Sequence, residues 1–279
     1  MTDNSSFGKL YIVSTPIGNL EDITLRALRI LKEVDLVAAE DTRHSAKLLN
    51  HYGISKPLLS YWSEKEKVRS DEIIEKLKSG MSVALISDSG TPGISDPGAV
   101  LIKKAIEADI NIIPIPGPSA VIAALSASGL AAEEFTFIGF LPPKESHRQK
   151  RLKELSLEMR TLIFYEAPHR ILETLADMKE ILGQRKAALI KELTKMHEET
   201  LRGDLTDIVD ALENHTIAGE YVIIVEGKTK ESLTADEALD EVRALMKKGK
   251  GRKEAVRLVA EAYGFSKKVL YDSSLSDAT

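Results

Sequence analysis

The residues with the clearest chemical signature form one loop, SDSGTPGISDPG at positions 87–98. Three glycines and two prolines fall between positions 90 and 98, which predicts a tight, irregular backbone that can approach a ligand closely. Asp96 and Pro97 have the residue types of a helix N-cap and a first helical position. Because the loop carries two carboxylates and no lysine, we predict a cationic or hydroxyl-rich ligand rather than a triphosphate.

Two further loops have the same position after a short apolar run. They are STPIGN at 14–19 and PIPGPSA at 114–120. In open α/β sheets, ligands bind outside the carboxyl ends of the strands, where such loops gather. Each loop alone could be an ordinary turn, but the three together predict one binding crevice.

The second half of the chain holds two clusters of ionisable residues, YEAPHR at 165–170 and KELTKMHEE at 191–199. Both follow apolar runs and mix acids, bases and a histidine within a few positions. Helix capping is the alternative explanation, with Glu166 near the positive end of a helix and Pro168 in its first turn. We interpret both clusters as catalytic or substrate-binding.

Other common sites are absent from the sequence. The only Gly-x-Gly lies at 249–251 and does not follow a strand, which excludes a dinucleotide fingerprint. The segment 227–229, GKT, imitates the end of a P-loop, but Val222 stands where the leading glycine belongs. There is no His-Glu-x-x-His motif and no cysteine, so we expect no metal site and no disulfide.

These loops need strands to position them, and short apolar runs predict two series of strands. The first series lies at 10–14, 35–39, 82–87 and 111–115, and the second at 135–140, 161–165, 187–190 and 221–226. An amphipathic helix follows the first strand and is expected to begin near Asp22 or Thr24. Strands that alternate with helical patterns predict an α/β fold. The break near 129–134 predicts two α/β domains, 1–131 and 132–231, with an active cleft between them.

Residues 232–279 differ in character and predict a small C-terminal helical module. Between Arg243 and Lys268, nine lysines and arginines occur with only two glutamates. We predict that this module binds RNA, because the excess of positive charge is larger than a solvated helix face needs. The alternative is a solvated bundle that only packs on the body.

Composition indicates a soluble, cytoplasmic protein without a membrane span. The net charge of −5 argues against a surface coated for nucleic acid, so basic patches would act locally. The N-terminal segment MTDNSSFG lacks the basic start and apolar run of a signal peptide. The uncharged stretch 110–132 contains three prolines in its first half, and we interpret it as a strand followed by a buried helix.

Seven segments, in order, resemble the tetrapyrrole methylase family. They are VSTPIGNLEDITLRAL, AAEDTRHSAKLL, SDSGTPGISDPG, PIPGPSAVIAAL, YEAPHRI, ELTKMHEE and GEYVIIV, and they span about residues 9–228. They are most similar to the branch that methylates a cytidine ribose in the decoding region of 16S ribosomal RNA, and the helical tail also looks like that of this branch. The resemblance implies two α/β domains with S-adenosylmethionine in the cleft between them, and a homodimer.

The resemblance also implies which residues contact the methyl donor. From the first domain these are Pro16, Ser89, Gly90, Thr91, Ile94, Ser119 and Ala120. From the second domain they are Glu166 or Ala167, together with Gly219 and Glu220. Such contacts use mainly backbone groups, which agrees with loops rich in glycine and proline.

The implied reaction is methyl transfer to a ribose 2′-hydroxyl of 16S rRNA, with the assembled small ribosomal subunit as the favoured partner. Because this hydroxyl is a poor nucleophile at neutral pH, the enzyme must supply alignment and proton removal. The candidate bases, left unranked, are Glu166, His169, Glu192 and Glu198. The residues expected to contact RNA are Arg170, Lys195, Lys248, Arg252 and Lys253.

Two other functions fit the same family: methylation of a tetrapyrrole ring, and a non-enzymatic role in ribosome assembly. The basic tail and the EAPHR and ELTK clusters favour RNA. This chain departs from the branch at 61–66, YWSEKE, where the branch usually has His and Asn, and at Lys191, where Arg is expected. Trp62 is either a stacking surface for a base or a partly exposed core residue.

Overall fold

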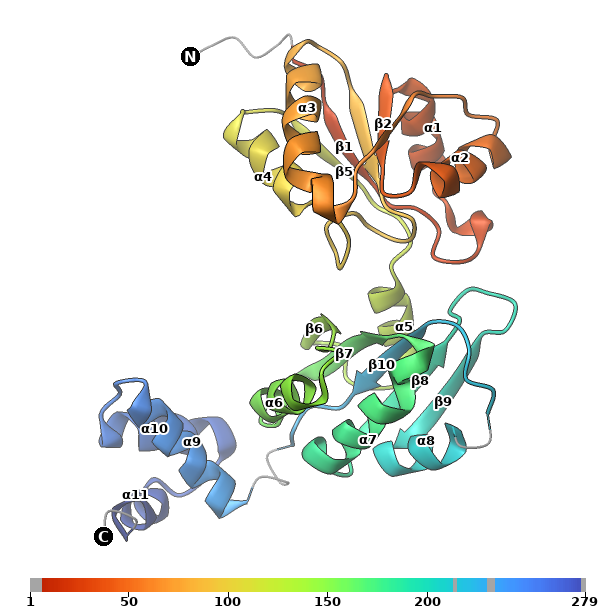
Figure 1. Ribbon diagram of the computed structural model, residues 1–279. Helices are drawn as coiled ribbons and strands as arrows, with labels where there is room; N and C mark the ends of the chain where they lie inside the picture. Colours follow the sequence, from red (N-terminus) through yellow and green to blue (C-terminus); the bar gives the residue numbers. More distant parts are fainter. Residues whose placement is uncertain (1–6, 213–214, 230–233, 277–279) are drawn as a thin grey trace.

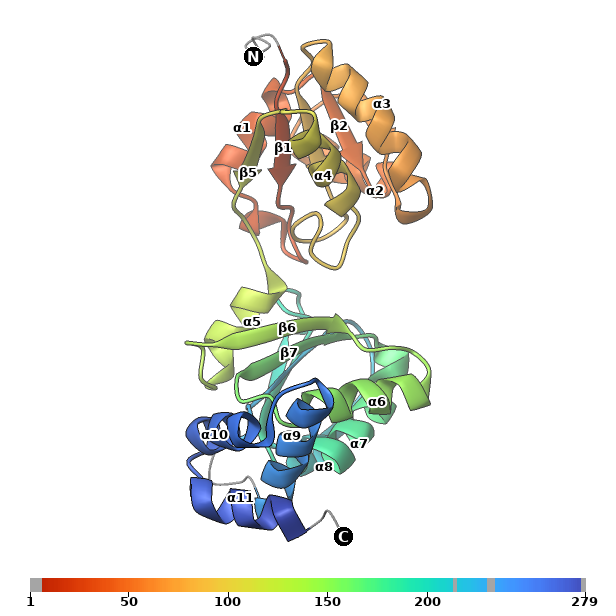
Figure 2. The same cartoon turned by 90° about the vertical axis from the view of Figure 1, so that its left-hand side faces the viewer.

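The computed structural model describes residues 7–212, 215–229 and 234–276, which form two lobes and a separate helical module (Figure 1). Each lobe is built on one five-stranded sheet. Figure 2 shows the module beside the second lobe and far from the first. In this described part of the chain, no helix is long and apolar enough to span a membrane.

The first sheet is parallel throughout, with strand order β3-β2-β4-β1-β5. Its strands are β1 (Leu10–Val13), β2 (Leu36–Ala39), β3 (Leu58–Ser60), β4 (Val83–Ile86) and β5 (Ile112–Ile115). Parallel strands covered on both faces need apolar residues at consecutive positions, and β2 and β4 are buried at every position. All four strands of the predicted first series are confirmed. The short β3 was not predicted, because three residues beside Pro57 give too little apolar pattern.

Helices cover both faces of this sheet. On one face lie α3 (Glu66–Lys78) and α4 (Ala99–Glu107), and on the other lie α1 (Leu25–Glu33) and α2 (Thr42–His51). The short turns η2 (Leu20–Asp22) and η3 (Ser63–Lys65) precede α1 and α3. The N-cap of α1 is Thr24, one of the two predicted starts, and its hydroxyl accepts a hydrogen bond from the Ala27 amide.

The start of α4 corrects one prediction. The N-cap is Gly98 and not Asp96, so Asp96 and Pro97 both lie before the helix. The loop first folds back on itself, since the Gly93 amide donates to the Pro97 carbonyl at 3.2 Å. A Cβ on Gly98 would lie 2.9 Å from the Gly93 nitrogen, so only glycine fits this turn at φ 151°.

The second sheet is mixed, with strand order β6-β7-β10-β8-β9. Its strands are β6 (Phe135–Phe140), β7 (Thr161–Glu166), β8 (Lys186–Lys191), β9 (Glu199–Asp204) and β10 (Tyr221–Val225). Strands β6 and β7 are parallel, and the remaining pairs are antiparallel. The predicted second series is confirmed. The edge strand β9 was missed because its sequence, ETLRGD, is largely polar.

Opposite faces of the second sheet pack against different helices. Helices α6 (Glu145–Leu155), α7 (Ile171–Leu182) and α8 (Leu205–Leu212) cover one face, and α5 (Ala120–Ser128) covers the other. Side chains alternate accordingly, with Phe164 packed toward α7 and Ile163 toward α5. Helix α5 therefore packs on the second lobe, although it falls within the range 1–131. The stretch 110–132 is a strand followed by this helix, as predicted.

The C-terminal module consists of α9 (Ala235–Lys247), α10 (Arg252–Tyr263) and α11 (Lys267–Ser276), which share a core of their own. A capping box between Thr234 and Glu237 begins α9. The Lys228 ammonium lies 3.1 Å from the Glu237 carboxylate and links the module to the end of β10. The predicted border at 231/232 lies outside the described residues.

Candidate functional site: a cleft between the two sheets

The loops that follow β1, β4 and β2 are joined by hydrogen bonds at the carboxyl edge of the first sheet. Thr15 and Gly90 exchange two backbone hydrogen bonds, of 2.8 and 3.2 Å. The hydroxyls of Ser14 and Thr91 lie 2.8 Å apart. Asp88 accepts a hydrogen bond of 3.1 Å from the backbone amide of Asp41, the residue whose carboxylate caps α2. The predicted crevice is therefore one connected set of loops.

The loop after β5 joins the same set by a close backbone approach. A Cβ on Gly117 would lie only 2.9 Å from the Ser14 Cβ, so this position excludes every side chain. Ser119, two residues later, is the N-cap position of α5. Helix α5 thus leads from the first lobe directly onto the second sheet.

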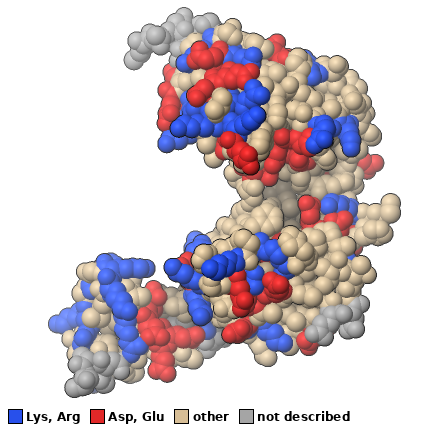
Figure 3. Space-filling model, in the orientation of Figure 1, with Lys and Arg blue, Asp and Glu red and all other residues tan. Residues whose placement is uncertain are grey.

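A cavity of about 460 Å³ lies between these loops and the carboxyl end of β7. Its volume is within the roughly 300–1,000 Å³ that is usual for small-ligand sites. Figure 3 shows the molecule hollowed between the two lobes, with acidic atoms gathered along the facing rim of the first lobe. Most predicted donor contacts line the cavity, namely Ser89, Gly90, Thr91, Ile94, Ser119, Ala120, Ala167 and Glu220.

The remaining two predicted donor contacts lie next to the cavity rather than in its wall. Pro16 lines a neighbouring cavity and Gly219 lines a separate hollow. Asp88 and Asp96, the two carboxylates of the predicted loop at 87–98, also line the cavity. Other lining residues were not named individually as donor contacts from the sequence: Ile17, Glu40, Ser95, Phe140, Tyr165, Pro168, Leu193, Tyr221 and Val222. Glu40 could have been found from its place directly after β2, the same position that singled out the other loops.

Negative charge dominates the cavity. Among the described residues that line it there is no lysine, arginine or histidine, whereas Glu40, Asp88 and Asp96 all contribute carboxylates. Burial, followed by repulsion from Glu40 and Asp88, raises the pKa of Asp96 to about 6. Burial and the neighbouring Asp88 also raise the pKa of Glu40. Such an environment favours a positively charged ligand. No group of three or more His, Asp or Glu in the described segments is placed to hold a metal ion.

One close contact between the two lobes is that of Ser95 with Gly139. Ser95 has a φ of 65°, which is unusual for a residue with a side chain, and Gly139 has a φ of 74° at a bulge in β6. A Cβ on Gly139 would lie 3.1 Å from the Ser95 hydroxyl. This contact places the Asp96 carboxyl opposite the second sheet.

Aromatic rings form the wall of the cavity on the second sheet. Tyr165 packs edge-to-face against Phe137 and Phe140, with centroid distances of 4.9 and 5.7 Å. Burial, with Asp96 nearby, raises the pKa of Tyr165 to about 12, so it remains a neutral hydroxyl at neutral pH. Phe140 is 53% exposed and lines the cavity, so it offers an apolar surface to a ring.

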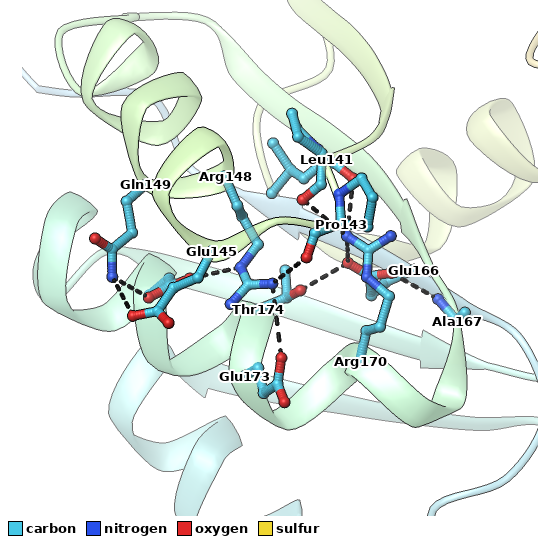
Figure 4. Close-up of polar contacts among 12 residues, drawn as sticks. Leu141, Pro143, Glu145, Arg148, Gln149, Glu166, Ala167, Arg170, Glu173 and Thr174 are labelled. Atoms are coloured by element: carbon cyan, nitrogen blue, oxygen red, sulfur yellow. Dashed lines mark hydrogen bonds and ion pairs between the residues drawn. The ribbon is translucent and has the colours of Figure 1, made fainter.

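Glu166 and Arg170, both singled out from the sequence, contact each other and the protein interior (Figure 4). One Glu166 oxygen accepts from the Ala167 amide at 2.9 Å, and the other accepts from the Thr174 hydroxyl at 2.7 Å. Arg170, in the turn η4 (Pro168–Arg170), lies 3.4 Å from that carboxylate and donates to the Leu141 carbonyl at 2.8 Å. These contacts favour structural roles for both side chains over proton transfer or phosphate binding.

The other predicted bases lie outside the cavity. His169 is exposed and is not part of its wall, and Glu198 lines the separate hollow with Glu192. The Lys195 ammonium lies 2.8 Å from Glu192 and 3.0 Å from Glu220. The hydrogen bond from Lys195 is the largest of the causes that lower the pKa of Glu192, which weakens it as a base. The positive charge of Lys195 is likewise balanced by two carboxylates.

Two further sequence predictions concern residues outside the cleft walls. Trp62 is half-buried, with the Lys65 ammonium 5.9 Å from the ring centroid, and both interpretations of it stay open. In the module, Lys248 and Lys253 are exposed and Arg252 is half-buried. None of these three has an acidic partner among the described residues, whereas the neighbouring Lys250 lies 2.9 Å from Glu254.

Comparison with known proteins identifies the family. The family described as Tetrapyrrole (Corrin/Porphyrin) Methylases matches residues 9–209. The chain belongs to the tetrapyrrole methylase family. Within this methylase family, it is 47% identical over 272 residues to the ribosomal RNA small subunit methyltransferase I of Synechocystis sp., covering 96% of this chain and 98% of the relative. It is 46% identical over 281 residues to the protein of the same name from Haemophilus influenzae, covering 99% of each. The protein is therefore a methyltransferase, in the branch of the family that contains these two relatives.

Solved structures show the same methylase fold. The uroporphyrin-III C-methyltransferase of Thermus thermophilus is similar with a TM-score of 0.57 and 22% identity, over 78% of this chain and 94% of that chain. Another structure of that enzyme, in complex with S-adenyl homocysteine, has a TM-score of 0.55 and 17% identity, over 79% and 98% of the two chains. At these identities, the likeness establishes the two-lobed fold alone.

Proposed function

We propose that this protein transfers the methyl group of S-adenosylmethionine to the ribose 2′-hydroxyl of a cytidine in the decoding region of 16S ribosomal RNA. The observation that carries the proposal is the 47% identity, over almost the whole chain, to a curated ribosomal RNA small subunit methyltransferase I. Identity of this extent includes the C-terminal module, which the family match at 9–209 does not reach. The module to which we assign RNA binding is thus covered by the similarity, as well as the two lobes.

The cavity fits a donor that carries a positive sulfur atom. When bound, S-adenosylmethionine supplies an activated methyl group on that sulfur. Glu40 and Asp88 would stabilise its charge, and the Ser89-Gly90-Thr91 turn and Ser119-Ala120 would hold it through backbone groups. Phe140 and Tyr165 offer apolar surface to a base or sugar ring.

The acceptor hydroxyl has to be aligned and to lose its proton. Alignment can contribute as much as roughly 7–11 kcal/mol, against about 10²–10⁴-fold for a general base. Glu166, His169, Glu192 and Glu198 remain proposed bases from the sequence, although their contacts weigh against Glu166. Asp96 is a further candidate base, because its carboxyl lines the cavity and its pKa of about 6 is close to neutral pH. We therefore assign proton removal first to Asp96.

The proposed substrate is the small ribosomal subunit, reached in the cytoplasm by a homodimer of this chain. Lys248, Arg252 and Lys253 support the RNA assignment, because these basic side chains have no carboxylate partner in the described part of the module. With a net charge of −5, the protein would rely on such local contacts rather than on its overall field.

The test is incubation of the pure protein with isotopically labelled S-adenosylmethionine and small ribosomal subunits from a strain that lacks the modification. Free 16S RNA serves as a second substrate, and nuclease digestion locates the label. We expect label in a 2′-O-methylated cytidine. Donor binding without label in either RNA would instead favour a tetrapyrrole acceptor. Failure to bind the donor in calorimetry would favour a non-enzymatic assembly factor.

A further inference from the structure

A second cavity, of about 520 Å³, adjoins the first. The two share Ile17, Asp88, Ser89 and Glu220 in their walls, so they are neighbouring parts of one cleft. The loop at 14–19 and helix α2 contribute most of the remaining wall. A chain molecule lying in the second cavity would therefore pass the mouth of the first.

The α2 side of this cavity carries a row of basic side chains. His44, Lys47 and His51 recur at intervals of three and four residues, which places them on one face of the helix, with Leu48 buried beneath. All three are exposed. The His44 amide donates to the Asp41 carboxylate at 3.4 Å, but within the described residues the side chains of His44 and Lys47 have no hydrogen bond or ion pair. The His51 ring packs edge-to-face on the Tyr52 ring, with a centroid distance of 4.8 Å. These groups are free to bind a ligand.

The opposite side of the second cavity differs in charge. Lys195 is held by Glu192 and Glu220 at 2.8 and 3.0 Å, so its charge is already balanced. Gly18 leaves space for the stem of this lysine, since a Cβ there would lie 2.5 Å from the Lys195 Cγ. Asp88 and Glu220 lie where the two cavities meet. Among the described residues that line this cavity, Lys47 on α2 is thus the only cation without a carboxylate partner, and negative charge increases toward the first cavity.

We propose that this α2 groove, defined by Gly18, His44, Lys47 and His51, binds the phosphodiester backbone of the RNA strand beside the target nucleotide. The inference rests on the proposed function and adds to it the path of the substrate. An anionic backbone is repelled by the carboxylates of the first cavity and attracted by α2. His44 and His51 lie about 10.5 Å apart along the helix axis, which gives room for successive phosphates. A ribose between them would face the first cavity.

The groove has a role distinct from that of the C-terminal module. Figure 2 shows the module at the end of the second lobe that is remote from the first lobe. Contacts there can anchor the ribosomal subunit, but they cannot position one ribose at the cavity. The groove adjoins the cavity directly and can do so.

The test compares Lys47→Glu with Lys32→Glu, a matched reversal of an exposed lysine on α1 that lines neither cavity. We expect Lys47→Glu to raise the KM for the RNA substrate by at least about tenfold. The slope of log KM against log salt should fall by about 0.7 for each lost phosphate contact. Donor affinity by calorimetry and the melting temperature should stay at the wild-type values. Lys47→Arg should restore RNA binding.

Anisotropy with a labelled fragment of the decoding region measures RNA binding independently of turnover. If Lys47→Glu and Lys32→Glu had equal RNA affinity and equal salt slope, the proposal that the α2 groove binds RNA would be wrong, even if the wild-type protein methylates RNA. If the wild-type protein transferred no methyl group but its RNA binding still depended on Lys47, the proposed function would be wrong and RNA binding in the α2 groove would be supported. Absence of RNA binding by the wild-type protein would overturn both.

Discussion

At the scale of single residues, the cleft assigns different chemistry to similar side chains. Asp96 and Glu166 are both carboxylates that lie beside the same cavity. Asp96 lies among other acids and is driven toward its neutral form, whereas both oxygens of Glu166 accept hydrogen bonds and an arginine lies beside them. The surroundings of Asp96 suit a proton acceptor, whereas those of Glu166 suit a residue that holds the cavity wall in shape.

Asp96→Asn tests the first role. Without the proton acceptor we expect kcat to fall about 100-fold, and the acid limb of the wild-type kcat/KM profile, near pH 6, to disappear. The pKa of Asp96 is raised in the folded state, so the folded protein binds more protons than the unfolded chain between about pH 4 and 6, and its stability falls as pH rises through that window. The variant should therefore be more stable at pH 7, by about 1 kcal/mol after allowance for solvent screening. A kcat near the wild-type value would remove Asp96 as the base.

Glu166→Gln tests the second role. Loss of the charge beside Arg170 should destabilise the fold by about 2 kcal/mol, because that guanidinium is only 15% exposed. At a temperature where the variant stays folded, kcat should remain within about threefold of wild type. Thermal unfolding and single-turnover kinetics measure the two effects. A large loss of kcat with an unchanged melting temperature would restore Glu166 as a catalytic base.

At the scale of elements, strand ends and bulges determine where the lobes meet. The loops after β1, β2, β4 and β5 are tied to one another, so the first lobe presents a rigid edge. The bulge in β6 brings Gly139 against Ser95, and neither residue has an ordinary φ. The backbone strain at Ser95 is typical of a functional site, and the geometry of this site depends on how closely the two sheets approach each other.

Gly139→Ala tests this contact, with Gly129→Ala as its control. Both glycines have positive φ, 74° and 81°, so both variants incur a backbone cost of about 1–2 kcal/mol. Only Gly139 has a neighbour in the way, because nothing lies within 4 Å of a Cβ on Gly129. We expect both variants to lose stability, but only Gly139→Ala to weaken binding of S-adenosylmethionine, by about tenfold. Equal donor affinity in the two variants would show that the contact does not shape the site.

At the scale of the whole molecule, charge is distributed unevenly over an acidic protein. The cleft is negative, the α2 groove carries the Lys47 ammonium between two histidines, and the module carries basic residues that have no carboxylate partner among the described residues. Figure 3 shows blue atoms on the outer side of the module in this view. Separate regions can thus hold a cationic donor and a polyanionic substrate without mutual interference.

The triple variant K248E/R252E/K253E tests the module in the full-length protein. We expect weaker binding of small ribosomal subunits, by about tenfold or more at physiological salt, with a reduced salt slope. Donor affinity should not change, because the module lies away from the cleft. The control K9E/K32E/K103E makes the same change in net charge on exposed lysines of the first lobe. Equal losses in both triple variants would show that only net charge matters.

The sequence by itself determined the strands that carry the loops, the α/β class, the helical module and most of the cavity-lining positions that we propose contact the donor. These features depend on local periodicity and on glycine and proline chemistry, which the chain carries at each position. It also contained the resemblance that the 47% identity to a curated relative supports.

Only the tertiary structure decided which ionisable groups share a site. Glu40, Asp88 and Asp96 come from separate loops, and their mutual repulsion exists only once β2 and β4 lie side by side. Glu166 and Arg170 looked catalytic in the sequence, yet their partners Thr174 and Leu141 show them engaged within the second lobe. The function of a charged side chain depends on its neighbours in space, and the distances between them are a property of the folded chain alone.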